Sequence, residues 1–203
     1  MTVAEIGNKN EQTVLTGPFG SNLGSEDFID SGVPVLTIGC LKEHGLNLEK
    51  AKFISEEKAN ELDRYRVREG DLLFSRMATV GRAGLVTKRY DNSIFNYHIM
   101  RLRLSEDIID PNYFLAYVRG SKIVSNYVKE VNHGATRDGI NTEQLLTLPV
   151  ALPPLAEQRC IVAEVERRLS VAAQVESVVA GALARASRLR QAVLKAAFEG
   201  KLV

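Results

Sequence analysis

The sequence predicts an α+β protein, with a mixed-sheet globular head followed by one long C-terminal helix. Residues 1–152 contain short β-like runs interrupted by Gly, Asn and Pro, whereas residues 155–199 contain no proline and a single glycine, Gly181. Pro153 and Pro154 separate the two regions, because each lacks a backbone N–H and disfavours a helical residue before it. We therefore expect one domain over 1–152 and a helical region over 153–203, with a helix of roughly 60 Å between about 157 and 198.

Within the head, turn residues mark the expected elements in order. Residues 32–38 read as a buried strand entered through a turn, and Ser55 is placed to cap a short helix over 56–62. A turn at 69–71 precedes a β-run, and residues 81–86 turn the chain back. Period-two alternation from about Ile99 predicts a half-buried strand. Asp110 and Pro111 predict a helix start, with a second helix over about 121–130 and a polar loop over 132–141.

The bulk composition is that of a folded soluble protein. Of 203 residues, 45% are hydrophobic and 25% are charged. No apolar run approaches the ~20 residues of a membrane span, and the first residues lack a signal pattern, so we expect a cytoplasmic protein that does not bind a membrane. Cys40 and Cys160 are far apart and are expected to be reduced thiols.

The net charge of +1 hides an uneven distribution along the chain. Residues 1–63 hold 5 basic and 11 acidic side chains, whereas residues 64–103 hold 9 basic and 3 acidic ones. Eight of those nine cations are arginine, which suits bidentate contact with phosphates and guanine edges. This local basic block indicates a nucleic-acid footprint on one face, or else a solvated strand surface paired with the acidic N-terminal third.

Polar side chains in glycine-flanked loops are the candidate contacts for a nucleic acid. The 75–84 loop carries three of them, a turn at 17–20 precedes two more, and the 132–141 loop holds the others. The expected DNA-binding residues are Ser21, Asn22, Arg76, Thr79, Arg82, His133 and Arg137. Arg64, Arg66 and Arg101 are expected to have structural roles instead.

The motifs of catalysis and cofactor binding are missing from the sequence. It contains no phosphate-binding loop, no G-x-G-x-x-G and no Asn-Pro-Pro-aromatic tetrapeptide, and its three histidines are scattered rather than paired for zinc. The triplet at 56–58 matches the end of a nuclease motif, but the first turn of a helix explains these charges better. We expect no catalytic residues, no metal and no cofactor in this chain.

Six blocks of the sequence resemble the target recognition domain of type I restriction–modification specificity subunits. They occur in the order and spacing typical of that family over about residues 14–200. The blocks are TGPFGS (16–21), GVPV (32–35), GDLLFSR (70–76), TVGR (79–82), GATRDGIN (134–141) and LPPLAEQRCIV (152–162).

The resemblance implies a non-catalytic, sequence-specific DNA-binding subunit. Such subunits usually carry two recognition domains and two conserved helices that pair antiparallel, so that the domains read two separated half-sites; this chain resembles a half-length form with one domain and one helix. The resemblance also implies docking to methyltransferase subunits, which bind S-adenosylmethionine, and to restriction subunits. The alternative is a coiled-coil interaction scaffold with a basic face and no DNA specificity.

The long helix carries a 3-4 repeat that predicts pairing with another helix. In an antiparallel homodimer centred near Leu183, Glu176 of one chain would approach Arg190 of the other, because both lie seven residues from the centre. The alternative is that the helix folds back on its own head. The expected dimerisation residues are Val165, Leu169, Ala172, Glu176, Val179, Leu183, Ala186, Arg190 and Val193.

Overall fold

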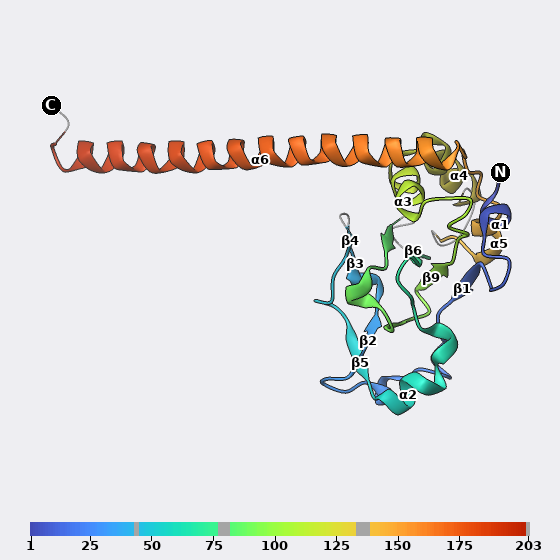
Figure 1. Cartoon of the computed structure of the whole chain (residues 1–203). Coiled ribbons are helices and arrows are strands. Elements are labelled where there is room, and N and C mark those ends of the chain that lie inside the picture. The colour runs from blue at the N-terminus through green and yellow to red at the C-terminus, as the bar shows by residue number, and fades with distance from the viewer. Residues whose placement is uncertain (43–44, 77–81, 133–138, 202–203) are drawn as a thin grey trace. The chain divides into compact units, whose positions relative to one another are not determined.

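The computed structural model describes residues 1–42, 45–76, 82–132 and 139–201 (Figure 1). By internal contacts the chain divides into two compact units, Met1–Arg159 and Cys160–Val203. The α+β class is confirmed, with small sheets in the first unit and a long helix that supplies the second.

A four-stranded antiparallel sheet forms the centre of the head. Its order is β1 (Val14–Thr16), β9 (Ile99–Leu102), β6 (Leu72–Ser75) and β7 (Ala83–Leu85) (Figure 1). All four residues of β9 are buried, and so are all four of β6. The half-buried strand expected from about Ile99 was therefore wrong, because β9 lies between β1 and β6 and is covered on both faces.

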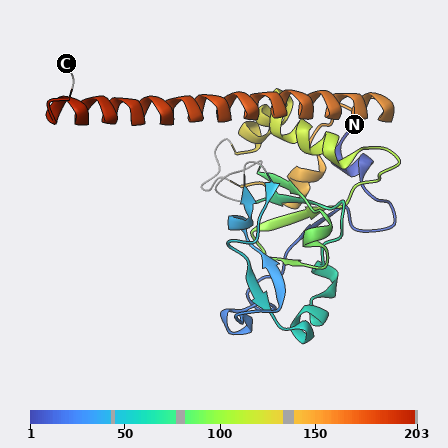
Figure 2. The same ribbon diagram turned by 60° about the vertical axis from the view of Figure 1, so that its left-hand side comes forward.

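A second sheet is mixed, as the sequence predicted for the head. β2 (Val33–Leu36) pairs antiparallel with β5 (Lys52–Ile54) and parallel with β8 (Ile94–Phe95). Both views place this sheet beside the first (Figures 1 and 2). A core that includes Leu36, Leu73, Phe95 and Ile99 joins the two sheets. A short hairpin completes the strands, with β3 (Leu41–Lys42) paired to β4 (Gly45–Leu46).

Helix boundaries follow the capping residues. Ser55 accepts a hydrogen bond from the Lys58 amide and starts α2 (Glu56–Glu61). Asp110 accepts one from the Asn112 amide, with Pro111 at the first position of α3 (Pro111–Gly120). Both predicted starts are confirmed. The remaining head helices are α1 (Val3–Ile6), α4 (Lys122–Asn132), α5 (Thr142–Leu146) and the 3₁₀ turns η1 (Ser25–Asp27), η2 (Ile38–Cys40), η3 (Asp63–Tyr65) and η4 (Lys88–Tyr90).

The long helix α6 (Leu155–Phe198) begins two residues before the expected start. Its first turn belongs to the head, where the buried Gln158 accepts a hydrogen bond from the Asp110 amide and donates to the carbonyls of Ile108 and Pro153. In the second unit its large apolar side chains are exposed, Leu183 by 66%. By length and composition alone α6 could also cross a membrane, a test that helices of soluble proteins pass too.

Candidate functional site

Four chain segments leave the four-stranded sheet at the same end. The antiparallel register places Thr16 of β1 opposite Met100, Ser75 of β6 opposite Ile99, and Phe74 opposite Ala83. The chain therefore leaves β1 and β6, and enters β9 and β7, at one end of the sheet. We call this the loop end; its described residues are 17–22, Arg76, Arg82 and 96–98.

The first loop is held by a glycine that no other residue could replace without rearrangement. The Gly17 amide donates to the Ile99 carbonyl, and a Cβ at this position would lie 2.3 Å from the Asn96 backbone. The Phe19 carbonyl then accepts from the amides of Asn22 and Leu23, at 2.8 and 3.1 Å. Leu23 is buried, whereas the side chains at 21 and 22 are exposed. The turn thus presents Ser21 and Asn22 to solvent.

Arg76 joins three segments at the loop end. Its amide donates to the His98 carbonyl, its carbonyl accepts from the Ile140 amide, and its Nη1 donates to the Tyr97 carbonyl at 3.2 Å. Its Nε is buried and has no hydrogen-bond partner. The guanidinium is therefore folded against the 96–98 loop. Burial, followed by the charge of Arg76, lowers the pKa of His98 below its ordinary value.

Arg82 differs from Arg76 in being available to a ligand. Its carbonyl accepts from the Ser75 amide, which closes the base of the β6–β7 connection. Its side chain is exposed, and within the described residues it has no ion-pair partner.

Two exposed aromatic residues at the loop end were not among the predicted site residues. The rings of Phe19 and Tyr97 stack with centroids 6.0 Å apart, and the two residues are 56% and 39% exposed. Tyr97 also contacts the ring of His98, at 3.9 Å between centroids. Phe19 and Tyr97 are 78 positions apart, so only the pairing of β1 with β9 brings them together.

The start of α5 also reaches the loop end. The hydroxyl of Thr142 lies 3.3 Å from that of Thr16, the last residue of β1. Of the predicted residues, Arg76 and Arg82 adjoin strand ends here, and Ser21 and Asn22 lie on the loop that follows β1. The other three, Thr79, His133 and Arg137, lie outside the described residues.

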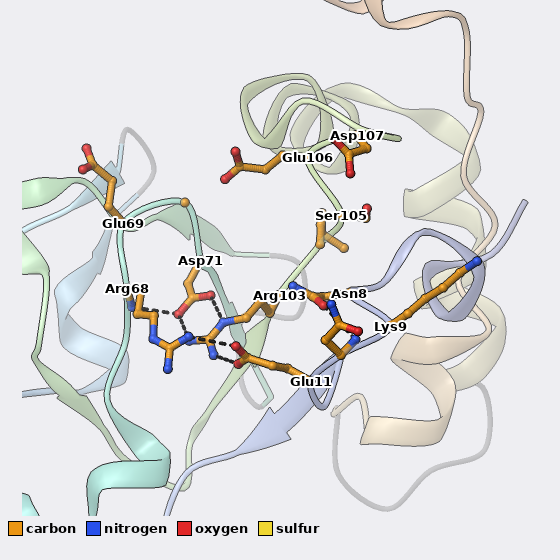
Figure 3. A pocket seen from close by; sticks show the side chains of 13 residues that line it. Asn8, Lys9, Glu11, Arg68, Glu69, Asp71, Arg103, Ser105, Glu106 and Asp107 are labelled. Atoms are coloured by element: carbon orange, nitrogen blue, oxygen red, sulfur yellow. Dashed lines mark hydrogen bonds and ion pairs between the residues drawn. The ribbon is translucent and has the colours of Figure 1, made fainter.

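The opposite end of the sheet carries a closed network of ion pairs beside a hollow of about 540 Å³ (Figure 3). Arg103 makes two 2.7 Å hydrogen bonds to the carboxylate of Asp71, and it also pairs with Glu11. Arg68 contacts the other oxygen of Glu11 at 2.8 Å. Hydrogen bonding to Asp71 raises the pKa of Arg103, and hydrogen bonding to Arg103 lowers the pKa of Glu11. The charges here satisfy one another, which indicates a structural role.

The ion pairs of the head distinguish between the two explanations of the basic block at 64–103, a nucleic-acid footprint or pairing with the acidic N-terminal third. Arg66 pairs with Glu56 and Asp63, whereas Arg68 and Arg103 both pair with Glu11. All three carboxylates come from the acidic N-terminal third. The pairing alternative therefore holds for three of the eight arginines. The remaining five are Arg64, Arg76, Arg82, Arg89 and Arg101.

Residues 19–167 match a family model described as the type I restriction modification DNA specificity domain. The chain is 31% identical over 180 residues to the type I restriction enzyme EcoKI specificity subunit of Escherichia coli K12, covering 85% of this chain and 38% of that one. It is 28% identical to the Escherichia coli EcoBI specificity subunit, over 87% and 37% of the two chains. The chain thus spans less than two fifths of the length of these relatives.

Solved structures share the fold. The HsdS subunit from Thermoanaerobacter tengcongensis superposes with a TM-score of 0.69 at 18% identity, over 96% of this chain and 47% of that one. A chain from a study of complex assembly and conformational transition in a type I R-M system gives a TM-score of 0.74 at 22% identity, over 99% and 45%.

Proposed function

Because the chain belongs to the family of type I restriction–modification DNA specificity domains, we propose that it reads a DNA sequence through the loop end of its four-stranded sheet. In this proposal the chain is not catalytic. It directs methyltransferase and restriction subunits to a target, acts in the cytoplasm, and leaves S-adenosylmethionine to the methyltransferase subunit. The resemblance in the 16–21, 70–76 and 152–162 blocks supports the same reading.

The observation that carries the proposal is the convergence of three loops at one end of a buried sheet, namely those after β1, between β6 and β7, and before β9. Base edges in the major groove are distinguished by hydrogen-bond donors, acceptors and the thymine methyl group. Ser21 and Asn22 supply short polar groups, Arg82 supplies an exposed guanidinium, and Phe19 and Tyr97 supply apolar surface. The rigid strands beneath hold these groups in a fixed arrangement, as sequence readout requires.

The test is selection from random duplexes by the full chain, followed by affinity measurement at several salt concentrations. We expect one enriched sequence and an affinity that falls steeply with salt. An interaction scaffold with a basic face would bind DNA with an affinity that falls with salt, but the selection would enrich no particular sequence. Selection should be repeated with the methyltransferase subunit present, because the relatives are named as subunits of a larger enzyme.

We further propose that α6 pairs antiparallel with a second copy of itself. Its 3-4 apolar repeat is exposed at Leu169, Val179, Leu183 and Val193, and Glu176 and Arg190 lie on the same stripe. Charged residues seven positions on either side of the centre favour a helical partner of the same sequence over a lipid environment. Such a dimer would carry two identical heads, and its DNA target would be two inverted half-sites separated by a spacer.

A further inference from the structure

A second hollow lies beside the four-stranded sheet, close to the network of Figure 3. It encloses about 420 Å³. Five arginines line it, against two acidic side chains. The arginines are Arg64, Arg66, Arg68, Arg101 and Arg103. We call it the arginine cleft.

Three of the five arginines are neutralised by carboxylates. Arg103 is held by Asp71, Arg68 by Glu11, and Arg66 by Glu56 and Asp63 at 2.8 and 3.3 Å. These pairs explain why most of the positive charge in the cleft is tolerated. They leave Arg64 and Arg101 without an acidic partner among the described residues.

Arg101 differs from the other arginines of the cleft, because it is 4% exposed and makes no ion pair with any residue that the structure describes. Its Nη1 donates to the carbonyls of Arg64 and Arg66, both at 3.3 Å. Its Nε is buried and has no hydrogen-bond partner. The carboxylates of Asp71 and Glu11 attract this charge without contacting it, so its burial is only partly offset, and a buried donor left unpaired is costly as well.

The surroundings of Arg101 add to this cost. Burial, and then the charge of Arg103, lower the pKa of Arg101. Arg103 lies two residues after Arg101, just past the end of β9. Arg64 stands on η3, is exposed, and rests its guanidinium over the ring of Tyr65 at 5.1 Å. An anion in the cleft would meet the guanidinium of Arg101 and the exposed guanidinium of Arg64, which both line it.

We propose that the arginine cleft binds a phosphate group, held by Arg101 from within and by Arg64 at its opening. Arg64 and Arg101 both line the cleft, and guanidinium groups bind phosphate oxygens through strong, charge-assisted hydrogen bonds. Two sources share this chemistry, free phosphate and a phosphate of a DNA backbone. The site is separate from the loop end and stands whether or not the loop end reads DNA.

The experiment titrates the full chain with inorganic phosphate in the low millimolar range, against chloride at equal ionic strength and pH. Calorimetry and the arginine Nε–H signals in an NMR spectrum report binding. We expect saturable binding and a shift of the Arg101 Nε–H signal. Working at low concentration matters, because concentrated phosphate stabilises any folded protein.

Two variants and a matched control locate the binding. Arg64→Gln should weaken phosphate binding about ten-fold or more and Arg101→Gln should abolish it, whereas Arg89→Gln, which changes an arginine outside the cleft, should leave it unchanged. If Arg101→Gln does not fold, the Arg64→Gln variant and the Arg101 Nε–H signal of the unaltered chain still test whether phosphate binds in the cleft. The proposal is overturned if phosphate acts no differently from chloride, or if Arg64→Gln and Arg89→Gln bind it equally.

Random-sequence duplex DNA then separates the two sources. If the cleft holds a backbone phosphate, inorganic phosphate competes with the duplex at constant ionic strength, and Arg64→Gln lowers the salt slope of binding by about one. If it holds free phosphate, duplex binding is the same in Arg64→Gln and in the unaltered chain. Either result identifies the ligand of the cleft.

Discussion

Arg103 connects three segments that lie far apart in the sequence. Its guanidinium contacts Asp71 at the start of β6 and Glu11 ahead of β1, while Arg103 itself follows β9. The side chain of Asp71 is 2% exposed and that of Arg103 is 10% exposed, so solvent screens this pair little. A buried pair of this kind costs free energy to desolvate, and breaking it by removing one partner costs more.

Asp71→Asn should therefore lower the free energy of unfolding by about 3–5 kcal/mol, because it leaves the buried guanidinium of Arg103 without its bidentate carboxylate. Urea unfolding of the full chain measures this. The matched control is Arg68→Gln, which breaks an exposed pair with Glu11 and should cost less than about 1 kcal/mol. Equal costs for the two variants would show that the network adds no particular stability.

The same network predicts how stability depends on pH. The hydrogen bond from Arg103 holds the pKa of Glu11 below its ordinary value of 4.5. A carboxylate with a lowered folded-state pKa stabilises the fold above its unfolded pKa, and this contribution is lost as pH falls through the folded value. The free energy of unfolding should accordingly decrease as pH drops below about 4.5, and Glu11→Gln should flatten that decrease. An unchanged profile in Glu11→Gln would exclude Glu11 as the titrating group.

If the loop end reads DNA as proposed, we expect Arg82 to contact a base, because its side chain is exposed and unpaired within the described residues. Arg82→Ala should weaken binding to the selected duplex by about 1–3 kcal/mol and relax one position of its sequence. Repeating the selection with the variant measures both effects. Arg89→Ala, also exposed, is the control and should keep the sequence preference. A uniform loss over all sequences would make Arg82 a phosphate contact instead.

Among the elements, those defined by local chemistry could be predicted from the sequence. Ser55 and Asp110 mark helix starts by their own side chains, and the Glu69–Asp71 turn precedes β6 as expected. Long-range pairing could not be predicted in this way. The parallel pairing of β2 with β8, the full burial of β9 and the stacking of Phe19 on Tyr97 all depend on which strands become neighbours.

The start of α6 shows the same limit within a recognised motif. The 152–162 block predicted a helix start, but the part played by Gln158 required the fold. The Gln158 side chain makes three hydrogen bonds. One of them is accepted from the backbone amide of Asp110, the residue whose side chain caps α3. One amide side chain thus couples the first turn of α6 to the start of α3.

Gln158→Leu should destabilise the head by about 1–3 kcal/mol, because it leaves the Asp110 amide and two carbonyls without partners in a buried position. Hydrogen exchange at Asp110 and Asn112, together with urea unfolding, measures this. Gln174→Leu, an exposed glutamine farther along the same helix, is the control and should leave both unchanged. If hydrogen exchange in Gln158→Leu becomes faster only within α6, then Gln158 stabilises its own helix and not the head.

For the whole molecule, the mirrored charges on α6 predict an antiparallel dimer. Glu176→Arg and Arg190→Glu should each weaken the dimer, because each brings like charges together across the seam. The double variant should restore it, since the opposite charges face each other again. Sedimentation at tens of micromolar measures the three variants. If both single variants and the double variant behave alike, the proposed register is wrong even where a dimer forms.

The loop end also has a consequence for how such a protein changes over generations. Hydrogen bonds along β1, β9, β6 and β7 set the spacing of the three loops, and that spacing does not depend on the exposed side chains that the loops carry. Substitutions at Ser21, Asn22 or Arg82 can therefore accumulate without disturbing the sheet, and under the proposed function we expect each to alter the preferred DNA sequence. Gly17, in contrast, cannot be substituted without a shift of the backbone, because the Asn96 backbone leaves no room for a side chain. Related proteins that prefer other DNA sequences should therefore differ at positions 21, 22 and 82 and should keep the glycine at position 17.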